Sequence, residues 1–272
     1  MEVALDKMFT TWQHLLLFFL PVFTSGMSTS DKDFFQFDDM LLTEEQVPLA
    51  LRAKFGLPEV STEEINFETA GKRDERYRWP DRTLNYDLSQ VVKAEDKTRI
   101  RTTLNILEKK FDGCLRFREA TSGYRVVVVD NGRCQSRVGF TNSSDNQELS
   151  LNSPWCMIPE TIEHEFMHAI GVQHTHSRPD RHNYVNIIED NIEPKEKHNF
   201  EQLKETEYNT FGLPYDYLSL MHYDAFAFSK EEGRLITIET FADPSKQDII
   251  GSAQGVSAGD IDLVKAMYKC YW

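Results

Sequence analysis

Two segments of the chain carry apolar residues at the spacing of an α-helix. In residues 93–111 the apolar positions lie three or four residues apart, as one helix face requires: Ile100, Leu104, Leu107 and Phe111. Gly113 lies just beyond them and predicts the end of that helix. A helix near the C-terminus is predicted from the spacing of Ile261, Val264 and Tyr268. Ser257 and Asp260 form a capping box at its start.

Shorter segments have the patterns of β-strands. Residues 83–88 alternate between apolar and polar positions, and residues 124–130 contain four successive valines, which are typical of a buried strand. Residues 134–140 follow the turn sequence Asn131-Gly132, and residues 147–152 form one more short strand. A sheet with helices is therefore predicted for the first part of the chain.

The pattern changes after residue 170. Residues 171–223 show no regular period and are rich in Pro, Asp and Asn, and the last helix follows this irregular part. Strands and helices that are followed by an irregular region predict an α+β fold with a cleft between two lobes.

The N-terminal segment has the pattern of a secreted precursor. Residues 15–23 are an apolar run that is too short for a membrane span and suits a signal peptide, with cleavage near Gly26. Residues 27–69 are acidic, have no strong period and contain no cysteine, so we expect a propeptide there. No later segment is apolar enough to span a bilayer, and we expect a secreted, extracellular protein without a membrane span.

Charge and length narrow the function classes. The chain has 272 residues, enough for one sizeable domain plus processing segments. It carries 44 acidic and 30 basic residues, for a formal charge of −14. Because nucleic-acid phosphates demand a basic face, this balance argues against a nucleic-acid partner.

The cysteines indicate an oxidising compartment. Cys114, Cys134, Cys156 and Cys270 form no C-x-x-C pair, which argues against a cysteine zinc site or a thioredoxin-like motif. An even number of cysteines fits two disulfides, for which counting alone leaves three pairings open.

The candidate metal ligands and the candidate catalytic base are concentrated in residues 164–174. His164, Glu165 and His168 form the motif H-E-x-x-H. On a helix the two histidines share one face and can bind one metal ion, while Glu165 stays free to act as a base. Gly171 allows a sharp turn, after which His174 can supply a third nitrogen.

Three protein ligands leave one position of a zinc ion open for water, which is the pattern of catalytic sites and not of structural ones. The complete motif H-E-x-x-H-x-x-G-x-x-H is the metzincin signature and is far rarer than its first five residues. We therefore expect one Zn²⁺ per chain, with His164, His168 and His174 as ligands and Glu165 as the catalytic base.

Two segments resemble the astacin family of secreted zinc metalloendopeptidases, which are made as inactive precursors. The first runs from His164 to Tyr184 and includes H-T-H-S-R-P-D-R at residues 174–181; the second is Ser219-Leu220-Met221-His222-Tyr223. The metzincin motif is shared by related families, whereas the S-x-M-H-Y turn is specific to astacins among them. The likeness extends from about residue 70 to the C-terminus and, more loosely, into the propeptide.

The resemblance implies a two-lobed catalytic domain over residues 70–272, with a twisted mixed sheet, an active-site helix and an irregular C-terminal lobe. Met221 would form the Met-turn beneath the zinc, and Tyr223 would bind the zinc or stabilise the oxyanion. The cysteine order implies the disulfides Cys114–Cys270 and Cys134–Cys156. The implied function is hydrolysis of internal peptide bonds in protein or peptide substrates.

The propeptide is similar to the family's F-x-G-D segment, whose aspartate covers the zinc in the precursor. Asp39 is the best match because Met40-Leu41-Leu42 follows it, while Asp38 stands where glycine is expected, so the aspartate is one of these neighbours. An activating protease would remove this inhibitor by cleavage near Ala70 or after Arg73.

Two positions depart from the family pattern. Thr175 replaces the usual glutamate after the third histidine, and His182 replaces an aspartate. Neither position is a zinc ligand or the base.

Other polar residues have weaker assignments. His176, His182 and His198 lie in polar sequence and are predicted to be solvated, and Asn142 begins a glycosylation sequon. Residues 147–151 resemble the family's upper-rim edge strand, which implies that an extended substrate pairs there by strand addition.

Two alternatives remain beside the astacin assignment. A zinc-bearing binding protein without activity would need neither Glu165 nor Tyr223, and a matrix-type protease would use a propeptide cysteine, which residues 27–69 lack.

Overall fold

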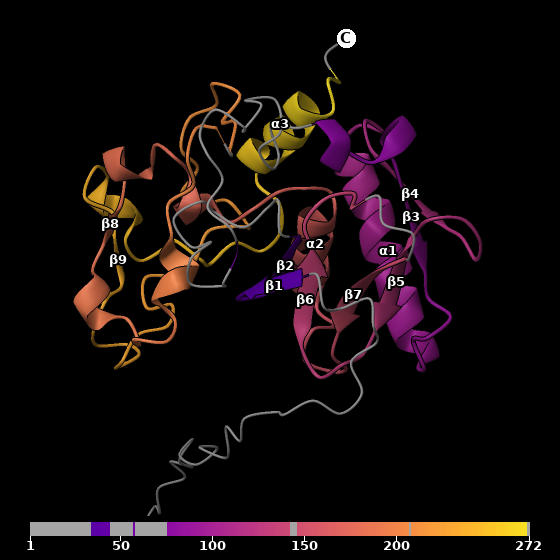
Figure 1. Cartoon of the computed structure of the whole chain (residues 1–272), viewed down its shortest axis with the longest axis horizontal. Helices are drawn as coiled ribbons and strands as arrows, with labels where there is room; N and C mark the ends of the chain where they lie inside the picture. Colours follow the sequence, from indigo (N-terminus) through magenta and orange to yellow (C-terminus); the bar gives the residue numbers. More distant parts are fainter. Residues whose placement is uncertain (1–33, 44–56, 58–74, 142–145, 207, 271–272) are drawn as a thin grey trace, which may run out of the picture. The chain divides into compact units, whose positions relative to one another are not determined.

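The computed structural model describes residues 34–43, 57, 75–141, 146–206 and 208–270 (Figure 1). The α-helices are α1 (Ala94–Lys110), α2 (Pro159–Ala169) and α3 (Ala258–Met267). The strands are β1 (Phe34–Phe37), β2 (Met40–Thr43), β3 (Thr83–Asp87), β4 (Arg116–Glu119), β5 (Val126–Val129), β6 (Cys134–Arg137), β7 (Gln147–Leu151), β8 (Asn186–Ile187) and β9 (Ile238–Glu239). Short 3₁₀ helices are η5 (Glu75–Tyr77), η6 (Pro80–Arg82), η7 (Thr175–Ser177), η8 (Arg181–Asn183), η9 (Glu189–Asn191), η10 (Lys197–Phe200) and η11 (Pro244–Lys246).

Within the described residues, seven strands form one mixed sheet in the order β1-β2-β6-β7-β5-β3-β4. Strands β7, β5, β3 and β4 are parallel to one another, and β6 is antiparallel to β7. The valine run of β5 lies inside the parallel part, where burial on both faces favours a continuous apolar segment. A mixed sheet combined with packed helices confirms the predicted α+β class.

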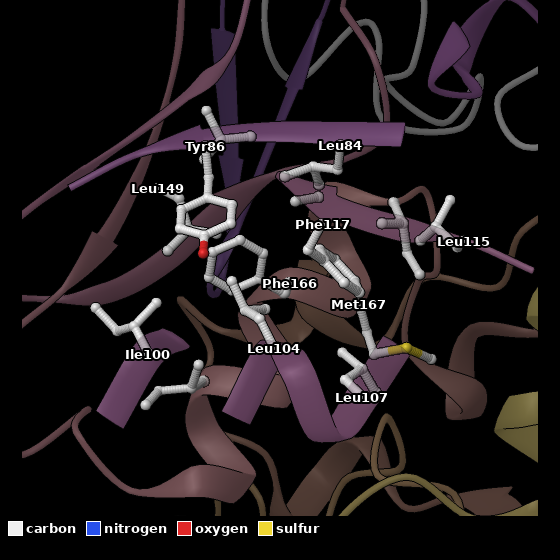
Figure 2. Packing of buried hydrophobic residues seen from close by; sticks show 14 of the residues in the cluster. Leu84, Tyr86, Ile100, Leu104, Leu107, Leu115, Phe117, Leu149, Phe166 and Met167 are labelled. Atoms are coloured by element: carbon white, nitrogen blue, oxygen red, sulfur yellow. The ribbon is translucent and has the colours of Figure 1, made fainter. Parts of the chain in front are cut away.

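The main hydrophobic core joins α1 and α2 to the sheet. The predicted apolar face of α1 is buried in it: Ile100, Leu104, Leu107. Phe166 of α2 meets the rings of Tyr86 and Phe117 edge-on, at centroid distances of 6.2 and 6.0 Å (Figure 2). Phe166 lies two residues from both His164 and His168, so its burial against the sheet turns the two histidines to the opposite face of α2.

A second hydrophobic cluster is formed by the irregular part of the chain. Its buried residues are far apart in sequence: Val185, Ile192, Phe200, Tyr215, Ala225, Ile238 and Ile250. The pair β8–β9 and short 3₁₀ helices are the regular elements described here. Single apolar residues separated by turns explain why this region shows no period in the sequence.

Strand β6 is shorter than the predicted strand 134–140 and ends at Arg137. Gly139 has φ +73°, and a Cβ there would lie 2.7 Å from the carbonyl oxygen of Tyr77. Its amide donates to the carbonyl of His168 at 2.9 Å. The chain therefore leaves the sheet at a glycine that passes close to the end of α2.

The prediction that residues 147–151 form an edge strand is wrong. Strand β7 pairs with β5 on one side and with β6 on the other. Its side chains are mostly buried, as an interior strand requires. The far side of β6 instead carries the hairpin β1–β2, with Met40 opposite Ser136 and Leu41 opposite Arg137 (Figure 1).

Several predicted features lie outside the described residues. These are the signal peptide 1–26, most of the propeptide, both maturation sites (Ala70 and Arg73) and Asn142. Within the part of the chain that the structure describes, no helix has the length and apolar character to cross a membrane.

The four cysteines form two disulfides, in the pairing that the resemblance implies. Cys114, after α1, is bonded to Cys270, after α3, and Cys134 of β6 is bonded to Cys156. The bridges close sequence separations of 156 and 22 residues. In the chain-entropy model, the larger loop restricts the unfolded chain more.

We predict that replacing Cys114 and Cys270 by alanine lowers the free energy of unfolding by about 5 kcal/mol, compared with about 3 kcal/mol for Cys134 and Cys156. Denaturant unfolding of the two double variants measures the difference. Equal losses would contradict an entropic origin, and non-reducing peptide mapping of the wild-type chain checks the pairing itself.

Candidate metal centre

Three histidines converge because α2 ends directly after the second of them. His164 and His168 lie one helical turn apart, with ring centroids separated by 4.7 Å. Gly171, at φ +102°, reverses the chain in a conformation that other residues rarely adopt. The ring of His174 is thereby placed 4.8 Å from that of His168 and 5.5 Å from that of His164.

Backbone carbonyls orient two of the imidazoles. Nδ1 of His168 donates to the carbonyl of Val172 at 2.7 Å, and Nδ1 of His164 donates to that of Leu220 at 3.1 Å. Each bond leaves Nε2 of the same ring as the basic nitrogen, which faces the common centre. Metal-binding histidines in proteins are commonly held in this way.

The carboxylate of Asp39 lies at that centre. One oxygen is 3.0 Å from Nε2 of His164, and the other is 3.3 and 3.2 Å from Nε2 of His168 and His174. Four potential ligand atoms, one from each residue, lie within 4.8 Å of one another. The hairpin β1–β2 brings Asp39 there, since residues 38–39 form its two-residue turn next to β6.

The donor set fits a zinc ion. Nε2 of His168, Nε2 of His174 and Oδ1 of Asp39 are buried without a hydrogen bond in the described structure. Such atoms are costly unless something binds them, and a divalent cation suits imidazole nitrogens and a carboxylate together. Three histidines and one carboxylate supply the four ligands of a tetrahedral zinc site.

Glu165 follows His164 on α2 and is not one of the four residues of this group. Its side chain is buried, and Oε2 has no hydrogen-bond partner in the described structure. Burial is the largest cause that raises the pKa of Glu165 well above its ordinary value, and the carboxylates of Asp39 and Asp38 add to it. A carboxyl with a raised pKa close to a metal site suits proton transfer.

The ring of Tyr223 packs against other aromatic rings at the edge of the metal centre. Its ring stacks on that of His176 at a centroid distance of 3.9 Å and lies 4.6 Å from that of His174. Its hydroxyl donates to Oδ2 of Asp38 at 2.6 Å. Burial, followed by the charges of Asp38 and Asp39, raises the pKa of Tyr223 well above its usual range, so the hydroxyl keeps its proton.

The prediction that His176 is solvated is wrong. Its side chain is fully buried between Tyr223 and Phe200, and Nε2 lies 3.0 Å from the carbonyl oxygen of Asn199. The aromatic surroundings therefore place His176 behind Tyr223, as part of the wall of the site.

Three further histidines of the described residues do not belong to the metal-binding group. His182 is exposed, as predicted, and His198 is half-buried, with Nδ1 2.9 Å from the carbonyl oxygen of Lys195. His222 is buried and bonded to Tyr215 and to its neighbour's carbonyl, which is a structural environment.

The segment around Met221 is tied to the third histidine. Met221 is fully buried, and its carbonyl accepts a hydrogen bond from the amide of Thr175 at 2.8 Å. The hydroxyl of Thr175 donates to that of Ser219 at 2.8 Å. Threonine at this position therefore joins the chain after His174 to the Met221 turn.

The side chain of Asp260 holds this turn in place by hydrogen bonds. Its buried carboxylate accepts from the Ser219 hydroxyl at 2.6 Å and from the Leu220 amide at 2.8 Å. The carbonyl of Leu220 in turn accepts from His164. The capping residue of α3 thus fixes the residue that orients a metal ligand.

Sequence reasoning missed three contributors to the site. Asp260 was identifiable only as a capping residue, because its contact with Leu220 spans 40 positions. Asp38 was considered only as the alternative to Asp39 for covering the zinc, and its contact with Tyr223 was not predicted. His176 belongs to the segment that resembles the astacins, but the polar sequence around it gave no sign that its side chain is buried.

Comparison with known proteins gives consistent matches. The family model "Astacin", which describes a family of peptidases, matches residues 71–269. "Zinc metalloproteinase nas-6" of Caenorhabditis elegans is 36% identical over 205 residues, which are 73% of this chain and 56% of that protein. "High choriolytic enzyme 1" of Oryzias latipes is 38% identical over 183 residues, covering 66% of this chain and 65% of that protein. The chain thus spans between half and two thirds of the length of these relatives.

A solved structure agrees with the fold. The chain is similar to the structure of high choriolytic enzyme 1, described as a hatching enzyme zinc-protease from Oryzias latipes, with a TM-score of 0.63 and 33% identity. The match covers 71% of this chain and 94% of that one.

We predict that Asp260→Ala lowers the free energy of unfolding by about 3 kcal/mol, because it leaves buried donors of Ser219 and Leu220 unsatisfied. Chelator competition should show zinc affinity falling about tenfold, the lower end for residues that orient ligands. Ser257→Ala is the matched control: it removes the cap of α3, for about 1 kcal/mol, and leaves the Leu220 contact intact. An equal zinc affinity in both variants would limit Asp260 to helix capping.

Proposed function

The chain belongs to the astacin family of zinc metalloendopeptidases, and we propose that it is a secreted enzyme, made as a latent precursor, that hydrolyses internal peptide bonds of proteins or peptides. The observation that carries the proposal is the convergence of three imidazole nitrogens next to Glu165, within a chain that matches this family. The cofactor is one Zn²⁺ per chain, and we assign His164, His168 and His174 as its protein ligands.

We propose three segments for the precursor: a signal peptide over residues 1–26, a propeptide over 27–69 and a catalytic domain over 70–272. The family match, which starts at residue 71, supports a catalytic domain that begins near Ala70. Cleavage there, or after Arg73, by an activating protease would separate the hairpin β1–β2 from the site.

Zinc, when bound, supplies a Lewis acid that lowers the pKa of a bound water from near 16 to roughly 7. Glu165 takes a proton from the attacking water and passes it to the leaving amine. The other glutamate next to His164, Glu163, is bonded to Lys110 at 2.7 Å and is not free for this role. The hydroxyl of Tyr223 donates to the oxyanion that forms on the peptide carbonyl.

Strand β6 is the edge on which we place an extended substrate. In the structure, the amide of Ser136 donates to the Asp39 carbonyl at 2.7 Å and the amide of Val138 donates to the Leu41 carbonyl at 3.4 Å. Both donors would be released when the hairpin leaves. An extended peptide can then pair with β6 by strand addition, which gives affinity without demanding a particular sequence.

Latency follows from the position of Asp39. Its carboxylate occupies the centre of the three histidines, where a catalytic site needs its open position. Because the hairpin is part of the same chain, the effective concentration of this ligand is high. The hairpin also covers the edge of β6, so metal access and substrate pairing are blocked together.

We predict that the mature Glu165→Gln variant keeps one zinc per chain but loses activity by about 10²-fold or more, because a neutral amide cannot take the proton. Peptide cleavage assays and metal analysis test this. Glu148→Gln, which removes an exposed carboxylate from β7, is the charge-matched control and should stay active. An active, zinc-free protein would refute the proposed function.

We predict that the uncut precursor with Asp39→Ala is at least about tenfold more active than the uncut wild type, because its metal site loses the tethered ligand. Intact mass confirms that neither chain is cleaved, and Asp248→Ala, at an exposed position, is the control. A silent Asp39→Ala precursor would show that steric coverage of β6, and not ligation, causes latency.

A further inference from the structure

The turn that carries Asp39 presents a second carboxylate to a different target. Phe37 pairs with Met40, so Asp38 and Asp39 form the two-residue connection between β1 and β2. Asp39 faces the three histidines, whereas Oδ2 of Asp38 accepts a hydrogen bond from the hydroxyl of Tyr223 at 2.6 Å. The two neighbours therefore contact the two chemically distinct parts of the proposed active site.

The conformation of Asp38 is one that glycine adopts more easily. Its φ is +52°, and a positive φ at the first position of a two-residue hairpin turn favours glycine. Aspartate tolerates this region better than most residues, but at a cost relative to glycine. A turn selected for shape alone would therefore not need a carboxylate at this position.

The partner of Asp38 is held firmly. The ring of Tyr223 stacks on His176 and packs against Phe200 and Phe228, with centroid distances of 5.7 Å to both phenylalanines. The loss of side-chain freedom on bonding to Asp38 is therefore small. A short hydrogen bond to a carboxylate from a restrained donor is among the stronger polar contacts in proteins.

We infer that Asp38 is a second latch of the precursor, which holds the Tyr223 hydroxyl while Asp39 occupies the histidine centre. This inference rests on the proposed latency and adds a second point of attachment to it. The hydroxyl bonded to Asp38 is not available to an oxyanion. Dissociation of the hairpin would expose the three histidines, the Tyr223 hydroxyl and the edge of β6 in one event.

Opening of the hairpin can be measured without any catalytic activity. The amide of Ser136 is bonded to the Asp39 carbonyl and the amide of Val138 to the Leu41 carbonyl, so both exchange with solvent when the hairpin leaves β6. Amides of the interior strand β5 report global unfolding in the same sample. The ratio of the two rates isolates the local opening.

The experiment is a double-mutant cycle in the zinc-loaded, full-length precursor that carries Glu165→Gln to prevent self-cleavage. We expect Asp38→Ala and Tyr223→Phe each to speed exchange at Ser136 and Val138 about tenfold or more, the size expected for a hydrogen bond to a charged group. The double variant should exchange no faster than either single variant, since both remove the same bond. Additive effects would overturn the inference.

Asp38→Gly separates the latch from turn conformation. Glycine fits the positive φ better, so a purely conformational role predicts slower opening in this variant. The latch predicts faster opening, because the carboxylate is lost. Slower opening in Asp38→Gly would overturn the inference even if Asp38→Ala opens faster.

The double-mutant cycle tests the Asp38 latch, and the activity of the Asp39→Ala precursor tests the proposed latency, so the two results can be told apart. A silent Asp39→Ala precursor with an intact cycle would reject ligation by Asp39 and retain the Asp38–Tyr223 contact. An active Asp39→Ala precursor with an additive cycle would retain the proposed latency and reject the second latch.

Discussion

The orientation of the three imidazoles is the constraint on which the site depends. A helix alone places His164 and His168 on one face, but their Nε2 atoms converge only because carbonyls of Leu220 and Val172 hold the opposite nitrogens. Val172 can do so because the chain turns immediately after α2. Leu220 can do so because Asp260 holds its amide from the third helix. Ligand geometry is therefore set by contacts between segments that are distant in sequence.

The sheet edge has a second role in this arrangement. Strand β6 packs along α2 and ends at Arg137, and two residues later the amide of Gly139 donates to the carbonyl of His168, so this sheet edge lies next to the helix that carries two of the histidines. An extended segment that pairs with β6 therefore runs next to the three histidines. The hairpin β1–β2 uses this path, and its turn reaches the centre because the strands on either side are held by backbone hydrogen bonds.

Features with short-range causes were predictable from the sequence. Spacing alone predicted the helix over residues 93–111 and a common metal site for His164, His168 and His174. The structure contains this helix and brings the three side chains together as a group that could hold one metal ion. The edge-strand assignment of residues 147–151 was wrong because strand order is set by tertiary pairing: β7 lies between β5 and β6, and β6 is the outer strand to which the hairpin adds. The burial of His176 was missed for a similar reason: the second cluster is assembled from single apolar residues, such as Phe200, that carry no periodic signal.

Three carboxyl groups share the space at the metal centre, and their environments differ. Burial alone would raise the pKa of Asp39, but the histidines, with His174 first, lower it well below its ordinary value. For Asp38, burial and the neighbouring charge of Asp39 raise the pKa, and the Tyr223 hydroxyl offsets part of this increase. Glu165 has no such donor, so burial and both aspartates act on it in the same direction. Burial and charge thus act on the three carboxyls in opposite directions: the pKa of Asp39, which faces the imidazoles, is lowered, while the pKa values of Asp38 and Glu165 are raised.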